Sequence, residues 1–215
     1  MEIILNAHAT KSSQRNELKN ILKSLIPQGG PPSLEELRKE RLKARNFQHY
    51  LHTFGHERRF DAFVEIIPLL SDTEYWPLVR SVWVSVEVIE PDKKIWLRLL
   101  QSKRPSRKLL MTDEEHAELA TMPDEVKIWR GCAHTAGVRG MSWTTEKSRA
   151  HFFAGYAGGP RRMFYAGPRE TTPIVASATC RKSKVLAYFT ERQESEIVLN
   201  PTNLKDVKIE SASEK

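Results

Sequence analysis

The spacing of apolar residues changes at Pro123, and this change constrains the fold more than any other feature of the sequence. Before Pro123, apolar side chains recur three and four residues apart, which is typical of amphipathic helices. After it, short runs rich in Val, Ile and Trp alternate with loops that contain glycine and proline, which is typical of strands. We therefore expect an α+β protein, with a helical region over residues 1–122 and a mostly β region over residues 123–215.

The helical half contains two sequence signals for helix starts. Ser33 and Thr112 each precede a glutamate by three residues, so both predict a capping box that satisfies backbone amides of the first turn. Gly55 is the predicted end of the second helix. Residues 76–89 contain alternating valines that leave a strand open, but the neighbouring patterns favour a helix. The expected helices are 14–26, 34–51, 60–70, 76–89, 95–100 and 113–122.

The second half predicts a series of short strands with one helix among them. The helix is expected over residues 145–154, directly after the second strand. Residues 155–171 are rich in Gly, Pro and Arg and predict a loop. The expected strands are 126–130, 141–144, 173–179, 185–189, 196–199 and 207–209.

Several classes of protein do not fit this sequence. No apolar run approaches the roughly 20 residues that span a bilayer, and Met1–Asn6 lacks the features of a signal peptide, so we expect a cytoplasmic protein without a membrane partner. The chain has no P-loop, no G-x-G-x-x-G fingerprint and no G-x-S-x-G elbow. Cys132 and Cys180 are expected to be reduced structural thiols. His49, His52 and His56 share a helical face, but polar helix surface is favoured over a zinc site.

Positive charge is concentrated in the first half of the chain. Residues 1–110 contain 19 Lys and Arg against 13 Asp and Glu, whereas residues 111–215 contain 15 against 14. Such clusters attract phosphate groups, although a solvated helix face is the commoner explanation. One cluster is Arg38, Lys39, Arg41, Lys43 and Arg45. The other, a candidate nucleic-acid-binding set, is Lys93, Lys94, Arg98, Lys103, Arg104, Arg107 and Lys108.

Three short motifs in the second half carry the candidate chemistry. They are Trp129-Arg130-Gly131, Ser142-Trp143-Thr144 and Glu194-Ser195-Glu196, with the helix Ala150-His151-Phe152-Phe153-Ala154 directly after the second. In this order they resemble the Arg–Ser–Glu class of mono-ADP-ribosyltransferases, which includes bacterial toxins and the Alt- and Mod-type enzymes of phages. The resemblance covers residues 123 to about 209. Trp143 and Thr144 depart from a Ser-Thr-Ser pattern, but the first hydroxyl is kept.

The resemblance implies a core of two packed small β-sheets that hold NAD in the cleft between them. The implied reaction transfers ADP-ribose from NAD, which is a substrate here, and releases nicotinamide; no metal is expected. Glu196 has the central role, because loss of nicotinamide leaves an oxocarbenium ion that a fixed carboxylate stabilises. Glu194 lies two residues earlier on the same face and is implied to orient or deprotonate the acceptor.

The same resemblance implies a set of NAD-binding residues. Arg130 offers a planar, permanently charged fork for the pyrophosphate or the adjoining ribose. Ser142 and Thr144 offer hydroxyls to the nicotinamide ribose or to the Glu196 carboxylate, and Phe153 is expected to pack the helix under the site. Gly131 allows close approach of backbone to the nicotinamide amide. The implied set is Arg130, Gly131, Ser142, Trp143, Thr144 and Phe153.

The acceptor stays open at this point. A nucleic acid, with RNA ahead of DNA, is favoured by the basic clusters, and some toxins of this superfamily that act in phage-defence toxin–antitoxin systems modify nucleic acid. A host protein side chain is the second hypothesis, as in phage enzymes that modify the transcription machinery. A non-catalytic binding module of the same fold is the third. Because an active enzyme of this kind would poison its cell, a neutralising antitoxin partner is expected.

Overall fold

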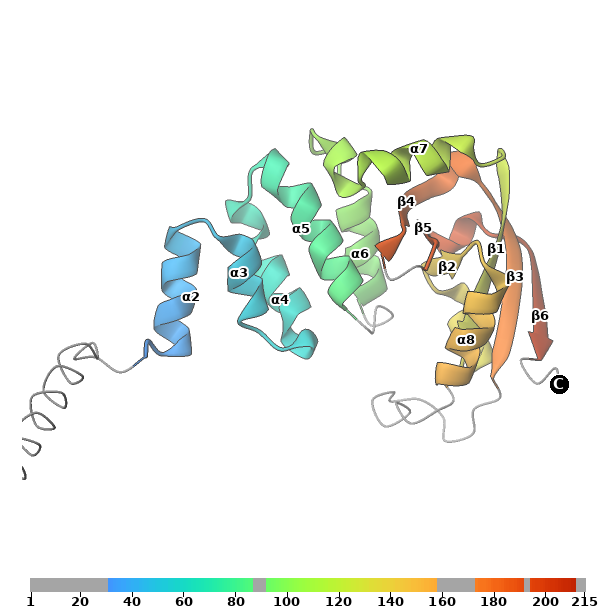
Figure 1. Cartoon of the computed structure of the whole chain (residues 1–215), viewed down its shortest axis with the longest axis horizontal. Helices are drawn as coiled ribbons and strands as arrows, with labels where there is room; N and C mark the ends of the chain where they lie inside the picture. The colour runs from blue at the N-terminus through green and yellow to red at the C-terminus, as the bar shows by residue number, and fades with distance from the viewer. Residues whose placement is uncertain (1–30, 87–91, 158–172, 192–193, 212–215) are drawn as a thin grey trace, which may run out of the picture. The chain divides into compact units, whose positions relative to one another are not determined.

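The computed structural model describes residues 31–86, 92–157, 173–191 and 194–211 of a chain that forms two compact units (Figure 1). The units are Met1–Thr53 and Phe54–Lys215. The described part of the first unit holds helices α2 (Leu34–Lys43) and α3 (Phe47–His52). The second unit holds the later helices together with the β-strands, so the boundary predicted after residue 122 lies inside it.

Helices α2 and α3 correct the prediction of one helix over residues 34–51. The predicted capping box at Ser33 is confirmed, because its hydroxyl accepts from the Glu36 amide while the Glu36 carboxylate accepts from the Ser33 amide. The helix ends early because Arg45 adopts a left-handed backbone conformation with φ of 53°. Asn46 then caps α3. The helix predicted over residues 14–26 lies outside the described residues.

The second unit begins with four helices, α4 (His56–Ile66), α5 (Asp72–Ser85), α6 (Lys93–Leu100) and α7 (Asp113–Thr121). Gly55 is the N-cap of α4 and not the end of the preceding helix. The capping box at Thr112 is confirmed, and Ser71 makes another at the start of α5. Helix α5 resolves the ambiguous valine-rich segment in favour of a helix. Its buried residues recur with helical spacing: Tyr75, Trp76, Leu78, Val79, Val82 and Trp83.

An aromatic cluster joins three of these helices. The Trp96 ring of α6 lies 4.6 Å from the Phe60 ring of α4 and 5.0 Å from the Trp83 ring of α5, measured between centroids. All three side chains are buried. The Trp83–Trp96 pair is edge-to-face, a geometry that aromatic quadrupoles favour. The cluster therefore fixes the position of the Trp83 side chain relative to α4 and α6.

The six strands of the described chain form one antiparallel sheet with the order β4-β5-β2-β1-β3-β6. The mixture of helices and strands is as expected, but the arrangement as two packed small sheets is not confirmed. β1 and β2 pair at Trp129 opposite Thr144, whereas β1 and β3 pair along eight residues. The paired length of neighbouring strands is therefore shortest in the middle of the sheet, between β2 and β1. The strands are β1 (Glu125–Cys132), β2 (Ser142–Thr144), β3 (Ile174–Arg181), β4 (Val185–Phe189), β5 (Glu196–Leu199) and β6 (Lys205–Ser211).

Helix α8 (Lys147–Ala157) covers β1 and part of β3 (Figure 1). Ala150 and Ala154 are fully buried against Val175 of β3, with Trp129 of β1 packed beside them. Small residues on the helix let its backbone approach the sheet closely. Gly131 is part of the same contact, since a Cβ there would lie 2.0 Å from the Ala150 carbonyl oxygen.

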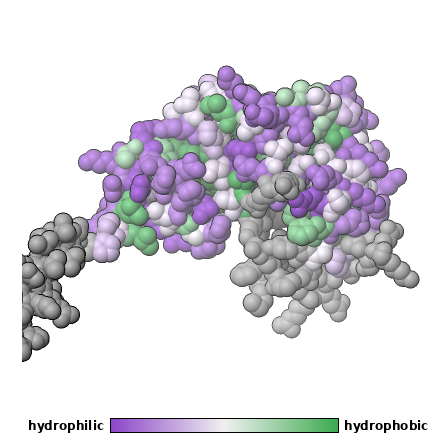
Figure 2. Space-filling view, in the orientation of Figure 1, coloured by the Kyte–Doolittle hydropathy of each residue, from purple (hydrophilic) through white to green (hydrophobic). Residues whose placement is uncertain are grey.

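Both cysteines lie inside the fold, and the visible surface is mostly polar (Figure 2). Cys132 and Cys180 are both buried and are not joined in a disulfide, and burial raises the pKa of Cys180 to about 11. Polar residues cover most of the visible face, with apolar residues in small separate groups (Figure 2). Within the described ranges, no helix has the length and apolar character needed to cross a membrane.

We predict opposite effects on stability for two glycine-to-alanine variants. Gly131→Ala places a methyl group 2.0 Å from the Ala150 oxygen and 2.4 Å from the Ala154 nitrogen, so it should lower the free energy of unfolding by about 3 kcal/mol. Gly155→Ala lies in α8 with open space around the new methyl group, so it should raise that free energy by about 1 kcal/mol. Urea denaturation of both variants measures the difference. Equal stabilities would contradict the close packing of α8 on β1.

Candidate active site

The sheet order brings the three motif-bearing strands together. β2 lies between β5 and β1, although β5 follows β2 by about fifty residues in the chain. Thr144 is paired with Glu196 on one side and with Trp129 on the other. Paired residues share a face of the sheet, so Ser142, Thr144 and Glu196 project to the same side. The serine and glutamate motifs therefore meet. On the adjoining strand Trp129 is opposite Thr144, so Arg130 starts from the other face and acts on this site through its long side chain.

The segment before β5 has a strained turn that side chains hold in place. Ser195 has a positive φ of 42°, which is uncommon for a residue other than glycine. The buried Thr144 hydroxyl donates to the Glu194 carbonyl over 2.8 Å and accepts from the Glu146 amide over 3.1 Å. The Ser195 hydroxyl donates to the Glu146 carboxylate over 2.6 Å. In this structure Thr144 therefore shapes the Glu-x-Glu segment and does not point its hydroxyl toward open space.

Glu196 is half-buried, and its carboxylate is bonded by two neighbours. The indole nitrogen of Trp83 donates to both carboxylate oxygens, over 3.2 and 3.1 Å. Burial is the largest influence and raises the pKa of Glu196. Hydrogen bonds from Ser142 and Trp83 and the charge of Arg130 lower this pKa, whereas the charge of Glu194 raises it. The net result is a carboxyl group that is harder to ionise than one in water.

Arg130 serves the loop between β1 and β2 in this structure. Its Nε donates to the Gly137 carbonyl over 2.9 Å, and Nη1 donates to the Ser142 carbonyl. The guanidinium also lies against Gly140, where a Cβ would be 2.3 Å from Cζ. These bonds place the cation beside Ser142 and close enough to Glu196 to affect its pKa.

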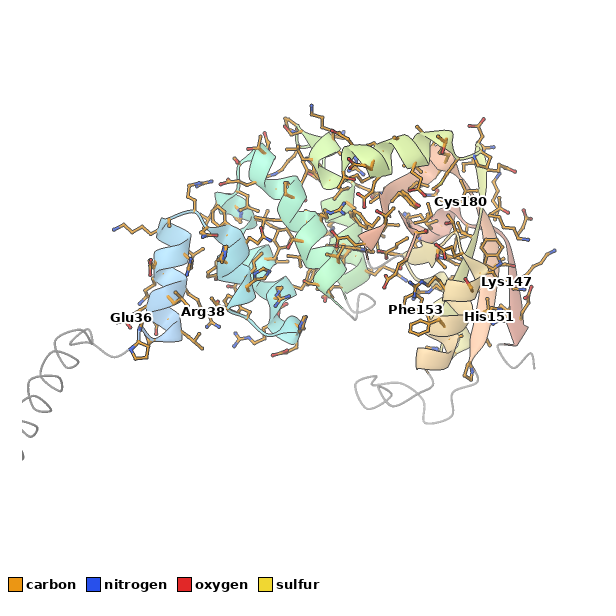
Figure 3. All side chains as sticks on the ribbon, viewed as in Figure 1. Glu36, Arg38, Lys147, His151, Phe153 and Cys180 are labelled. Atoms are coloured by element: carbon orange, nitrogen blue, oxygen red, sulfur yellow. The ribbon has the colours of Figure 1, made fainter. Side chains whose placement is uncertain are left out.

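Three residues of the implied NAD-binding set have other surroundings. Trp143 projects to the opposite face from Ser142, is buried, and donates its indole N–H to the Gly140 carbonyl over 3.0 Å. The backbone of Gly131 packs against α8, where a Cβ would not fit. This packing by itself explains why the residue is a glycine. Phe153 lies on α8 (Figure 3). Its ring centroid is 5.5 Å from that of the exposed Phe152. Its expected role in packing this helix fits its half-buried position.

The second basic cluster needs a correction, because two of its seven cations are part of the packing. Arg104 donates to the Leu70 carbonyl and lies over the Tyr75 ring. Arg107 donates to the Leu100 and Leu186 carbonyls, and burial lowers its pKa. Both guanidinium groups are thus partly occupied by contacts within the fold. Lys93 bonds to the Arg139 carbonyl, which leaves Lys94, Arg98, Lys103 and Lys108 as the exposed members.

Sequence reasoning missed the contribution of α5 to the site. Trp83 contacts Glu196, and one turn earlier Arg80 is paired with the buried Glu115 of α7 and with Glu191. The Glu115 carboxylate also accepts from the Thr190 amide. No local signal marks Trp83, because its spacing within α5 is that of an ordinary core residue. Only contact with a residue more than a hundred positions away reveals it.

Comparison with known proteins does not assign the chain to a family. No protein-family model, curated protein or solved structure matches the chain. Within the described residues, no group of three His, Cys, Asp or Glu side chains is placed to hold a metal ion. The geometry around Glu196 is therefore the main indication of function.

The raised pKa of Glu196 leads to a prediction about stability. A carboxyl group with a raised pKa in the folded state contributes stability that is present at low pH and lost as pH rises through that pKa. Glu196→Gln keeps the shape of the side chain but cannot ionise, so the variant does not lose this stability as pH rises. We expect the variant to have a higher Tm than the wild type at about pH 8, with the difference shrinking as pH falls toward about 4. A difference in Tm that does not vary with pH would contradict the raised pKa.

Proposed function

We propose that this protein is an NAD-dependent ADP-ribosyltransferase in which Glu196 is the catalytic carboxylate. The observation that carries the proposal is the adjacency of β1, β2 and β5, which gathers Arg130, Ser142 and Glu196 from three separate stretches of sequence. Each motif alone is common. Their meeting around one half-buried carboxylate is what the proposed chemistry needs.

The reaction accounts for the properties of Glu196. The bond between the ribose C1′ and the nicotinamide nitrogen breaks, and its electron pair leaves with nicotinamide. Positive charge then develops on the ribose, and an ionised carboxylate in a poorly solvated position stabilises it more strongly than one in water. A nucleophilic atom of the acceptor supplies the electron pair of the new bond to C1′ and loses a proton, for which Glu194 is the proposed base.

Arg130 and Ser142 are the proposed NAD ligands. A guanidinium has five N–H donors, and the two loop carbonyls take one from Nε and one from Nη1. The other donors suit the pyrophosphate or the ribose next to it. The proposed binding mode has NAD lying between the halves of the sheet that β1 and β2 join, as two small sheets would hold it. Trp143 and Gly131 support this arrangement through packing.

Glu196→Gln should abolish transfer while leaving a folded protein. We expect the rate of ADP-ribose transfer from labelled NAD to fall by at least about a hundredfold, because the charge that stabilises the transition state is gone. Glu210→Gln is the matched control, since Glu210 lies on the edge strand β6, which β2, β1 and β3 separate from β5. Full activity of the Glu196 variant would refute the assignment.

We propose a nucleic acid, with RNA first, as the acceptor. The support is the positive charge that stays exposed after the correction, at Lys94, Arg98, Lys103 and Lys108 on and after α6. Clustered cations bind phosphates without regard to sequence and so suit a first contact with RNA. A protein acceptor and a non-catalytic module are the competing outcomes, and a neutralising antitoxin remains an expected partner.

Labelled NAD incubated with the protein and a cell lysate separates these outcomes. Label released by ribonuclease and kept after protease is the expected result. Label released by protease would instead identify a protein side chain, and no label with any variant would favour the binding module. RNA labelling should weaken as salt is added, because counterion release drives contacts to phosphate. Labelling that is indifferent to salt would exclude a role for the exposed cations.

A further inference from the structure

We propose that Trp83 is a positioning residue of this site, whose indole N–H holds the Glu196 carboxylate in one orientation and makes α5 part of the active centre. This inference rests on the proposed function. It concerns a helix that lies about forty residues before the first motif, in the region that the sequence separates from the catalytic core.

The N–H of Trp83 is shared between the two oxygens of the Glu196 carboxylate. Trp83 Nε1 lies 3.2 Å from one Glu196 oxygen and 3.1 Å from the other, so the N–H points between them. A donor placed in this way resists rotation of the carboxylate about its last side-chain bond. A carboxylate has about four lone-pair sites; the shared contact takes one on each oxygen and Ser142 takes another, which leaves a site for a ribose hydroxyl.

The indole is well suited to hold a catalytic carboxylate because it is neutral. A guanidinium or ammonium in the same place would orient the group but would also cancel much of its charge. An indole N–H is a donor only and carries no net charge. Trp83 therefore fixes the direction of Glu196 and leaves its negative charge to act on the positive ribose.

The position of Trp83 is itself determined by two contacts of α5. Its ring is held edge-to-face by Trp96 at 5.0 Å. One turn earlier, Arg80 donates to Glu115 of α7 and to Glu191 over 2.9 Å each. Glu191 lies shortly before Glu194, so α5 is attached to both ends of the segment that leads into β5. The helix and the catalytic segment are thus held together at two points.

Trp83→Phe and Trp96→Phe form a matched pair of variants. Both residues are buried in the same aromatic cluster, and both substitutions replace an indole by a smaller ring. Trp83 loses a hydrogen bond to Glu196, whereas the Trp96 nitrogen has no hydrogen-bond partner among the described residues. Effects of lost volume are common to both variants, and Phe at position 96 still places an aromatic ring beside Trp83, so the N–H to Glu196 is the main difference between them.

The activity test uses the full chain with NAD. We expect Trp83→Phe to lower kcat for nicotinamide release about tenfold, with KM for NAD nearly unchanged, and Trp96→Phe to lower it much less. The acid limb of the kcat profile should move to higher pH in Trp83→Phe, because a bond that favours the carboxylate is gone. The other charged groups that act on Glu196 are Glu194 and Arg130, and both variants retain them. Arg80 stays paired with Glu115 and Glu191.

A second measurement needs no activity. The Tm of each variant falls below that of the same variant carrying Glu196→Gln as pH rises, and the pH at which this difference levels off reports the pKa of Glu196 in the folded protein. This pH should be higher in Trp83→Phe than in Trp96→Phe. If no variant releases nicotinamide, the proposed function fails, and a shift in this pH still establishes the contact. Benzothienylalanine at position 83 keeps the shape of the indole without its N–H, and should reproduce the shift if Trp83→Phe does not fold.

Two results would overturn the proposal. If Trp83→Phe and Trp96→Phe have the same kcat, and their Tm differences level off at the same pH, the N–H does not act on Glu196. A lower kcat in Trp83→Phe without any movement of that pH would assign Trp83 a purely structural role.

Discussion

The partial withdrawal of the Glu196 carboxylate from water is the constraint on which the rest of the site depends. A buried charge is costly unless its lone pairs are bonded, and here Trp83 and Ser142 bond them. Both bonds lower the pKa of the carboxyl, but burial outweighs them, so its pKa stays raised and its charge, once formed, is poorly screened. The surroundings that make Glu196 costly to the fold are therefore those that would stabilise the positive ribose of the proposed reaction.

Holding such a group requires the segment before it to be rigid. Thr144 bonds to the Glu194 carbonyl, and Arg80 and Glu115 fix the residues after β4 from the helical side. Breaking a buried ion pair by removing one partner is strongly destabilising, so this network strongly constrains α5 relative to the sheet. The helices of the second unit are accordingly bonded to the sheet through specific side chains. They supply contacts that determine where Glu196 points.

Much of the local structure could be predicted from sequence, because its causes are local. Ser33 and Thr112 begin helices as their glutamates three residues later indicate. Other features have causes that are not local. Arg45 ends α2 through its backbone conformation, and a solitary arginine carries no signal for that. Arg107 looks like part of a surface cluster, but its guanidinium reaches the Leu186 carbonyl from nearly eighty residues away.

The sequence by itself determined the class of elements and the residue types that could perform the chemistry: an arginine, a serine and two glutamates on short strands. Tertiary structure decided which of them meet. The order of the strands places Ser142 beside Glu196, turns Trp143 away and sets Gly131 under α8. It also added Trp83, which the sequence presents as one more apolar position of a helix. The reason is physical: spacing along a chain encodes the periodicity of one element, whereas contacts between elements depend on packing that no single segment contains.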